Sequence, residues 1–223
     1  MKLVHKDLER QIVFKEPFGC CEWIIESPQL FSKYLYELYA QTEGREGCFV
    51  LSNDDKTLEI SKCSELILQP LSVNVNDKKI LNKLYGELEK LAFSEDMFLL
   101  TQEMRGKLQE YFFNLEQRCT YPLSIEDDID ILSIFKAVGI KCEKYSDDIF
   151  VNLIEYIKIV SQLFNKKLFI FVNIRSYICD EQLKQLLKET AYKEVNILLI
   201  ENKKRSCLYD VAEYIIDCDN CEI

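Results

Sequence analysis

Short apolar stretches alternate with turns in the N-terminal part of the chain, a pattern typical of β-strands. We expect strands at 11–14, 20–26, 48–51 and 65–68. Between the second and third of these, apolar residues recur every three to four positions from about Pro28 to Ala40, which predicts an amphipathic helix. Ser27 suits the N-cap of this helix, and Pro28 suits its first turn.

Helical periodicity replaces the strand pattern near residue 76. One expected helix begins after a cap at Asn76 or Asp77 and continues to about Leu91. A second helix runs from about 95 to 119, and no proline interrupts it. Two long helices with a short connection predict a helical hairpin that forms a lobe of its own.

Beyond Pro122, helices and apolar strands alternate. We expect helices at 129–138, from a Ser146 cap to 164, and at 180–190, and strands at 168–172, 195–200 and 213–217. Gly139 suits a left-handed helix end. Because the strands are continuously apolar and separated by helices, they indicate a mostly parallel sheet covered by helices on both faces. The predicted fold class is α/β, with an α/β domain over 1–72 and 121–223 and a helical domain over 73–120.

The composition supports long regular elements in a protein that does not enter the membrane. The 223 residues include only 6 glycines and 4 prolines. No apolar run reaches the roughly 18 residues of a membrane span. The charged start of the chain also lacks a signal-peptide core. We therefore expect a cytoplasmic protein with no membrane partner.

The chain has 10 cysteines, scattered through the expected strands and helices. This distribution favours small apolar side chains in a reducing cytosol. Cys218 and Cys221 have CxxC spacing, but there is no second pair, and one pair supplies at most two of the usual four zinc ligands. The only histidine, His5, is far away in sequence. We therefore interpret the thiols as structural.

The turn Ser27-Pro28-Gln29 stands between a strand and a helix, where a nucleotide-binding α/β protein carries its phosphate loop. It has no glycine and no Lys-Ser/Thr pair. Asn173 follows the strand 168–172, where a magnesium-binding aspartate is expected. With His5 as the only histidine, near the flexible start of the chain, a nucleophilic Ser or Cys would have almost no general base. The sequence therefore predicts a nucleotidase framework without enzymatic activity; the alternative is a degenerate nucleotide-binding protein with weak NTPase activity.

Four acidic residues cluster at the end of the expected helical domain: Glu126, Asp127, Asp128 and Asp130. One interpretation is a helix N-terminus, which acidic side chains favour through the helix dipole. The other is a calcium site, because several carboxylate oxygens converging on one turn suit Ca²⁺. The spacing lacks the glycine and the ligand pattern of an EF-hand and does not decide between these interpretations.

The net charge of −10 argues against a simple monomer that binds nucleic acid. Basic residues nevertheless form local groups, namely Lys136, Lys141 and Lys144; Lys166 and Lys167; and Lys203, Lys204 and Arg205. The ordinary interpretation is solvated loops and helix ends. If several copies of the chain directed such groups into one channel, they would bind phosphates without reading bases.

Several segments in the second half resemble a known family. They are Ile134–Lys141 (IFKAVGIK), Ile149-Phe150, Lys166–Asn173 (KKLFIFVN), Glu181–Leu187 (EQLKQLL) and Val195–Glu201 (VNILLIE). Together with looser N-terminal matches, such as WIIESPQLFSKYLYELY, they resemble the CRISPR-associated adaptation protein of type II-A systems, the Csn-two family. The resemblance spans nearly the whole chain and rests on many short matches in order.

The resemblance implies an ABC-ATPase-like head that is inactive as a nucleotidase, together with an α-helical leg. It also implies a homotetrameric ring that binds double-stranded DNA, preferentially at ends, without reading sequence, and that calcium stabilises. The implied role is spacer acquisition in antiviral defence, alongside the integrase and effector nuclease of the system. The basic groups become candidate DNA contacts. Glu126 and Asp127 become the first candidate calcium ligands, with Asp128 and Asp130 beside them. A protein-binding helical adaptor remains the competing non-enzymatic interpretation.

Overall fold

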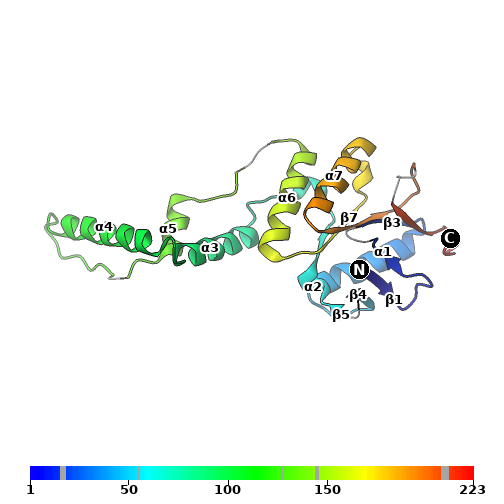
Figure 1. Cartoon of the computed structure of the whole chain (residues 1–223), viewed down its shortest axis with the longest axis horizontal. Helices are drawn as coiled ribbons and strands as arrows, with labels where there is room; N and C mark the ends of the chain where they lie inside the picture. Colours follow the sequence, from blue (N-terminus) through cyan, green and yellow to red (C-terminus); the bar gives the residue numbers. More distant parts are fainter. Residues whose placement is uncertain (16–18, 55, 127, 144–145, 207–210) are drawn as a thin grey trace. The chain divides into compact units, whose positions relative to one another are not determined.

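The computed structural model describes residues 1–223 except 16–18, 55, 127, 144–145 and 207–210 (Figure 1). The chain divides into two compact units. The α/β unit comprises residues 1–75 and 144–223, and the helical unit comprises 76–143. None of the helices in the described residues combines the length and the apolar character needed to cross a bilayer.

A parallel sheet forms the centre of the α/β unit, as predicted. Its strands, in spatial order, are β6 (Ser64–Ile67), β7 (Leu168–Val172), β8 (Asn196–Glu201), β3 (Cys20–Ile25) and β9 (Ala212–Ile216). Each neighbouring pair in this order is parallel. Every residue of β7 and β8 is buried. The sequence of β7 is therefore continuously apolar rather than alternating, and that of β8 is apolar between Asn196 and Glu201.

A second, antiparallel sheet has the order β2 (Ile12–Val13), β1 (Lys2–His5), β4 (Phe49–Asn53) and β5 (Lys56–Leu58). The strands expected at 11–14 and 48–51 belong to it, whereas β1 and β5 were not predicted. Helix α1 (Pro28–Thr42) and this sheet share one apolar core with the parallel sheet. Trp23, Tyr34 and Leu51 are among its buried members. The core thus joins both sheets into one unit.

Helices α6 (Ile149–Phe164) and α7 (Asp180–Tyr192) lie on the other side of the parallel sheet from α1 (Figure 1). Their buried residues include Leu153, Ile157 and Leu186. The short elements α2 (Ile60–Cys63), η1 (Pro70–Ser72) and η2 (Ile174–Ser176) complete the unit. The sheet is thus covered on both faces, as the apolar strands predict.

The N-cap of α6 differs from the prediction. Asp148, and not Ser146, occupies it, and one carboxylate oxygen accepts hydrogen bonds from the N–H groups of Phe150 and Val151. The hydroxyl of Ser146 instead accepts a hydrogen bond from the N–H of Asp148. The helix begins later than expected because the carboxylate reaches the first free donors of the helix itself.

The helical unit contains α3 (Lys78–Ala92), α4 (Phe98–Glu116) and α5 (Ile131–Val138). It extends to residue 143, beyond the expected 73–120, because the segment that contains α5 is tied to α3. Tyr85 donates a hydrogen bond to the carbonyl of Ile140, and the Asn76 amide pairs with the backbone of Cys142. Gly139 ends α5 in the left-handed conformation, with φ of 74°, as predicted.

The Asp148 cap can be tested directly. We expect Asp148→Ala to lower the free energy of unfolding by about 1 kcal/mol, because two N–H donors of α6 lose their acceptor. Ser146→Ala removes only the acceptor that supports the cap and should have the smaller effect. Urea denaturation followed by circular dichroism measures both changes. A larger effect of Ser146→Ala than of Asp148→Ala would indicate that Ser146 is the N-cap residue.

Candidate nucleic-acid and metal sites

The turn Ser27-Pro28-Gln29 lies where the sequence predicts it, between β3 and α1. Ser27 is the buried N-cap residue and Pro28 stands at the first helical position. Proline has no N–H, so the helix start offers one donor fewer than a phosphate-binding loop would. The turn is shaped to begin a helix rather than to enclose a phosphate.

Asn173 follows β7 directly and adopts a left-handed conformation with φ of 52°. Its side-chain oxygen accepts a hydrogen bond from the N–H of Asn202, 3.2 Å away. Its own N–H donates to the carbonyl of Ile200. Asn173 therefore ties the carboxyl ends of β7 and β8 together, and it places an amide where a nucleotidase would have a metal-binding carboxylate.

A buried ion-pair network occupies the same end of the sheet. The Arg175 guanidinium in η2 lies 2.8 Å from a carboxylate oxygen of Glu22 in β3 and 3.1 Å from one of Asp180 at the start of α7. The Arg175 backbone N–H donates to Glu201 at the end of β8. Glu22 and Glu201 have no solvent exposure. One arginine thus connects two strands and a helix.

The surroundings shift the pKa of two carboxyl groups in the network in opposite directions. A hydrogen bond from Ser206, and then one from Arg175, lowers the pKa of Asp180. Burial raises the pKa of Glu201. Stability linked to Glu201 is therefore present at low pH and is lost as pH rises through its raised pKa. One oxygen of Glu22 and one of Glu201 have no hydrogen-bond partner among the described residues.

Both carboxylates contact Arg175: Glu22 pairs with its guanidinium, and Glu201 accepts a hydrogen bond from its backbone N–H. The sequence analysis did not identify them, although a signal exists. Each is a charged residue at or within an otherwise apolar strand, CCEWII for Glu22 and NILLIE for Glu201. Such a charge is buried only with a partner. For Glu22 that partner is the Arg175 guanidinium, just after a third apolar strand; for Glu201 it is Arg205, whose Nε lies 4.0 Å from the carboxylate.

Lys166 is not a surface cation. It is buried, and its ammonium group donates to the carbonyls of Ser61 and Ser64 at 2.7 and 2.6 Å. It also lies 3.7 Å from the Glu65 carboxylate. Lys166 therefore anchors the segment before β7 to the segment around α2, and we exclude it from the candidate DNA contacts.

The other basic candidates vary in exposure. Lys136, Lys141 and Lys203 are exposed, Lys167 is half-buried, and Lys144 lies outside the described residues. Lys204 is exposed and lies 3.2 Å from Glu213. Arg205 is half-buried, and its guanidinium donates to the Ser176 hydroxyl. Arg205 therefore belongs partly to the buried network.

A basic groove in the α/β unit was not predicted from the sequence. Lys15, Lys184 and Lys188 line it, with apolar residues such as Leu187 between them, and its volume is about 450 Å³. Two of these lysines are one helical turn apart on α7, a spacing that places them on one face. The sequence signal for this groove was the four-residue spacing of Lys184 and Lys188 in the predicted helix 180–190.

The four acidic candidates do not act as one group in a single chain. Asp130 caps α5, accepting hydrogen bonds from the N–H groups of Leu132 and Ser133. Asp128 pairs with Arg105 of α4. Glu126 is exposed, and Asp127 lies outside the described residues. The helix-terminus interpretation thus holds for Asp130, whose pKa is lowered chiefly by the Ser133 hydroxyl.

Glu126 and Asp128 line a groove of about 600 Å³ within the helical unit, between the end of α4 and the segment before α5. Phe112 and Phe113 form its apolar part, and Glu116 contributes a further carboxylate. The groove gathers acidic side chains beside exposed aromatic rings. That combination suits a surface that another chain covers.

Helix α4 exposes apolar residues on most of its circumference. Among its described residues, Thr101 alone is buried. The exposed apolar residues of α4 are Phe98, Leu99, Leu100, Tyr111, Phe112, Phe113 and Leu115. An exposed helix this apolar is typical of an interface with another chain.

Only one of the described cysteines is buried. The Cys21 thiol donates to the carbonyl of Val13, and burial raises its pKa to about 12, so this thiol is inert. Cys179, Cys218 and Cys221 are exposed. Cys21 therefore fits the interpretation as a small apolar side chain in the core, whereas the three exposed cysteines do not.

Comparison with known proteins places the chain beside CRISPR-associated proteins. The family model described as CRISPR-associated protein (Cas_Csn2) matches residues 41–220, which span both units. A CRISPR-associated protein Csn2 from Streptococcus agalactiae is 28% identical over 200 residues, covering 87% of this chain and 86% of the relative. A CRISPR-associated protein Csn2 from Enterococcus faecalis is 26% identical over 196 residues, covering 86% of each chain.

The Arg175 network predicts a large effect of a single substitution. Arg175→Met leaves Glu22 buried without its partner, and we expect the free energy of unfolding to fall by about 3–5 kcal/mol. Adding Glu22→Gln removes the stranded charge and should recover part of this loss. Denaturant unfolding of the two variants measures the recovery. A single variant as stable as the unmodified chain would contradict this account of the network.

Proposed function

The chain belongs to the Cas_Csn2 family of CRISPR-associated proteins, and from this premise we propose that it serves CRISPR adaptation as a non-enzymatic, ring-forming DNA-binding protein. The proposed role is spacer acquisition together with the integrase and effector nuclease of the system. The observation that carries the proposal is a parallel sheet in which the turn between β3 and α1 lacks a phosphate loop. The buried carboxylates of this sheet, Glu22 and Glu201, belong to the Arg175 network.

The α/β unit is, in this proposal, an ABC-ATPase-like head kept for its shape and its surfaces. Nucleotide hydrolysis needs a phosphate cradle and a carboxylate that holds the metal. Pro28 stands at the start of α1, Asn173 follows β7, and Glu201 accepts from the Arg175 backbone. These three features support a protein without NTPase activity.

Assembly of several copies explains how an acidic chain could bind DNA. The apolar surface of α4 offers a place where copies could meet, and a closed homotetramer would cover it. Lysines from several copies could then face one channel, although the net charge of each chain is −10. Contacts limited to phosphates would make binding independent of sequence.

The proposed DNA contacts are six exposed lysines from the two units. They are Lys15, Lys184 and Lys188 of the groove and Lys203, together with Lys136 and Lys141 of the helical unit. A double-stranded DNA end carries dense negative charge, and binding it releases counterions. The basic groove supports this assignment because the ammonium groups of three lysines line it, and each of them can neutralise a phosphate.

Calcium is proposed to support assembly through the acidic groove. Glu126 and Asp127 remain the first candidate ligands, together with Asp128. Of the described acidic residues, Glu116, Glu126 and Asp128 line the groove. Asp130 contributes less, since its oxygens already cap α5. Carboxylates from one chain that do not converge could complete a site with those of a second copy, since Ca²⁺ takes six to eight oxygen ligands.

A protein-binding adaptor is the second candidate function. The exposed apolar face of α4 supports it equally well, because such a face could accept a different protein instead of another copy. DNA binding distinguishes the two candidates. The adaptor predicts none, whereas the ring predicts steep salt dependence.

The DNA proposal predicts a difference between linear and covalently closed duplexes. A ring threaded from an end should bind linear DNA and fail to bind closed circles of the same sequence, in a gel-shift assay with calcium present. Affinity should fall steeply with salt and not depend on sequence. Equal binding to closed circles would exclude threading, and absence of binding at low salt would favour the adaptor.

Substitution of the groove lysines tests their proposed role in DNA binding. We expect Lys184→Glu with Lys188→Glu to weaken binding and to lower the slope of log affinity against log salt by about one for each lysine that no longer neutralises a phosphate. Lys62→Glu with Lys90→Glu is the matched control, because both side chains are exposed and the charge change is equal. Equal losses of affinity in both variants would point to net charge rather than to the groove.

Calcium-dependent assembly has its own test. We expect Glu126→Ala with Asp127→Ala to shift the protein towards smaller species in calcium, as measured by sedimentation velocity. Glu95→Ala with Asp96→Ala removes an adjacent, exposed acidic pair of the same unit and serves as the control. A tetramer that is unchanged in chelator would reduce the acidic cluster to a helix terminus.

A further inference from the structure

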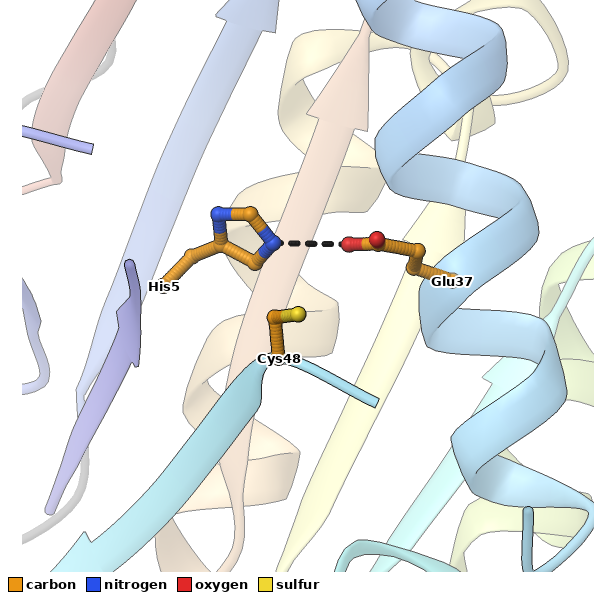
Figure 2. A group of neighbouring side chains, drawn as sticks. All are labelled: His5, Glu37 and Cys48. Atoms are coloured by element: carbon orange, nitrogen blue, oxygen red, sulfur yellow. Dashed lines mark hydrogen bonds and ion pairs between the residues drawn. The ribbon is translucent and has the colours of Figure 1, made fainter. Parts of the chain in front are cut away.

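Three side chains that are distant in sequence meet in the α/β unit: His5, Glu37 and Cys48 (Figure 2). His5 ends β1, Glu37 lies in α1, and Cys48 directly precedes β4. One ligand atom of each lies within 4.8 Å of the others, and the His5 Nε2 atom is 2.7 Å from a Glu37 oxygen. Among the described residues, this is the only such group of three or more His, Cys, Asp or Glu side chains.

The His5 ring is held in place before any ligand arrives. Its side chain has no exposed surface. The ring packs against Tyr34 and Phe49, with centroid distances of 5.0 and 4.5 Å. The expectation that the only histidine lies in a flexible start of the chain is therefore wrong, because β1 pairs with both β2 and β4.

Cys48 is held against α1 by its neighbour in sequence. The Gln41 side chain, one helical turn after Glu37, accepts a hydrogen bond from the Phe49 N–H and donates one to the Phe49 carbonyl, both at 2.9 Å. This pair of bonds keeps the backbone beside Cys48 next to the turn of α1 that carries Glu37. All three ligand groups are thus positioned by regular structure, which suits a built site.

We propose that His5, Glu37 and Cys48 form a site for Zn²⁺, with a water molecule as the fourth ligand. An imidazole nitrogen, a carboxylate oxygen and a thiolate sulfur are all zinc ligands, and three protein ligands plus water is an established zinc arrangement. The thiolate disfavours Ca²⁺ and Mg²⁺, which select oxygen. The site is therefore independent of the calcium proposed for the helical unit.

The hydrogen bonds around His5 define what zinc must displace. The Asp7 N–H donates to Nδ1, so the ring proton is on Nε2 and points to Glu37. Zinc needs the Nε2 lone pair, so this proton moves to Nδ1 and the Asp7 hydrogen bond opens. Cys48 releases its thiol proton to solvent. Binding therefore releases one proton per chain, and the zinc, thiolate and carboxylate charges cancel.

The site is open to solvent. Glu37 is 28% exposed and Cys48 is half-buried, so an ion can reach the site from solvent.

Metal titration of the full-length, metal-free chain tests this proposal. Co²⁺ is the spectroscopic probe, and Zn²⁺ affinity is measured by competition with a chromophoric chelator. We expect one ion per chain, a near-ultraviolet band from charge transfer between thiolate and Co²⁺, and release of one proton in calorimetry across buffers. Cys48→Ser should abolish the band and weaken Zn²⁺ binding at least about tenfold.

Three further variants locate the metal. Glu37→Gln keeps a hydrogen-bond acceptor for His5 and should weaken binding without unfolding the chain, as checked by circular dichroism. Cys63→Ser, which alters another half-buried thiol, and Cys218→Ser with Cys221→Ser, which removes the exposed CxxC pair, should both retain the band. No binding by the unmodified chain, or loss of the band only in the CxxC variant, would overturn the proposal.

Discussion

The burial of charge at one end of an all-parallel sheet is the constraint on which the α/β unit depends. Glu22 and Glu201 lie on neighbouring strands with no exposed surface. The Arg175 guanidinium pairs with Glu22, the Arg175 N–H donates to Glu201, and Arg205 lies 4.0 Å from the Glu201 carboxylate. Removing only one partner from a buried pair leaves an unpaired charge and costs far more than the pair itself contributes. The network therefore fixes β3, β8, η2 and α7 as a set.

Much of the architecture follows from apolar periodicity. The strand predicted at 168–172 agrees residue by residue with β7, because five consecutive buried positions leave no room for another interpretation. The parallel sheet and α1 follow from the same reasoning. The predicted helical hairpin does not form, because α4 continues away from α3 (Figure 1) and α3 packs with α5 instead. The edges were less predictable: β1 and β5 are short, and their pairing with β4 depends on partners far along the chain. Likewise, α5 joins the helical unit through Asn76 and Tyr85, contacts that periodicity does not encode.

Residue roles were harder to predict than elements, because a role depends on which neighbours the fold supplies. The family was predicted correctly from segments such as 166–173, yet within that segment Lys166 is buried and donates to two carbonyls. Composition alone counts this lysine with the surface cations. For His5, the sequence suggested no role, because no other candidate ligand is near it in sequence. In the structure its ring is fully buried and lies beside Glu37 and Cys48. In each case a contact across many residues decided the chemistry.

Charge and assembly are linked by the physics of screening. At physiological salt, exposed charges interact over roughly 8 Å, so a local lysine groove is not cancelled by acidic residues elsewhere on a chain with net charge −10. A single groove neutralises few phosphates, and its affinity is correspondingly low. In the proposed ring, each added copy contributes further phosphate contacts to the same duplex, and their counterion-release terms sum. The apolar face of α4 and the lysine groove are therefore complementary requirements: the first would bring the copies together, and the second would make that assembly a DNA-binding one.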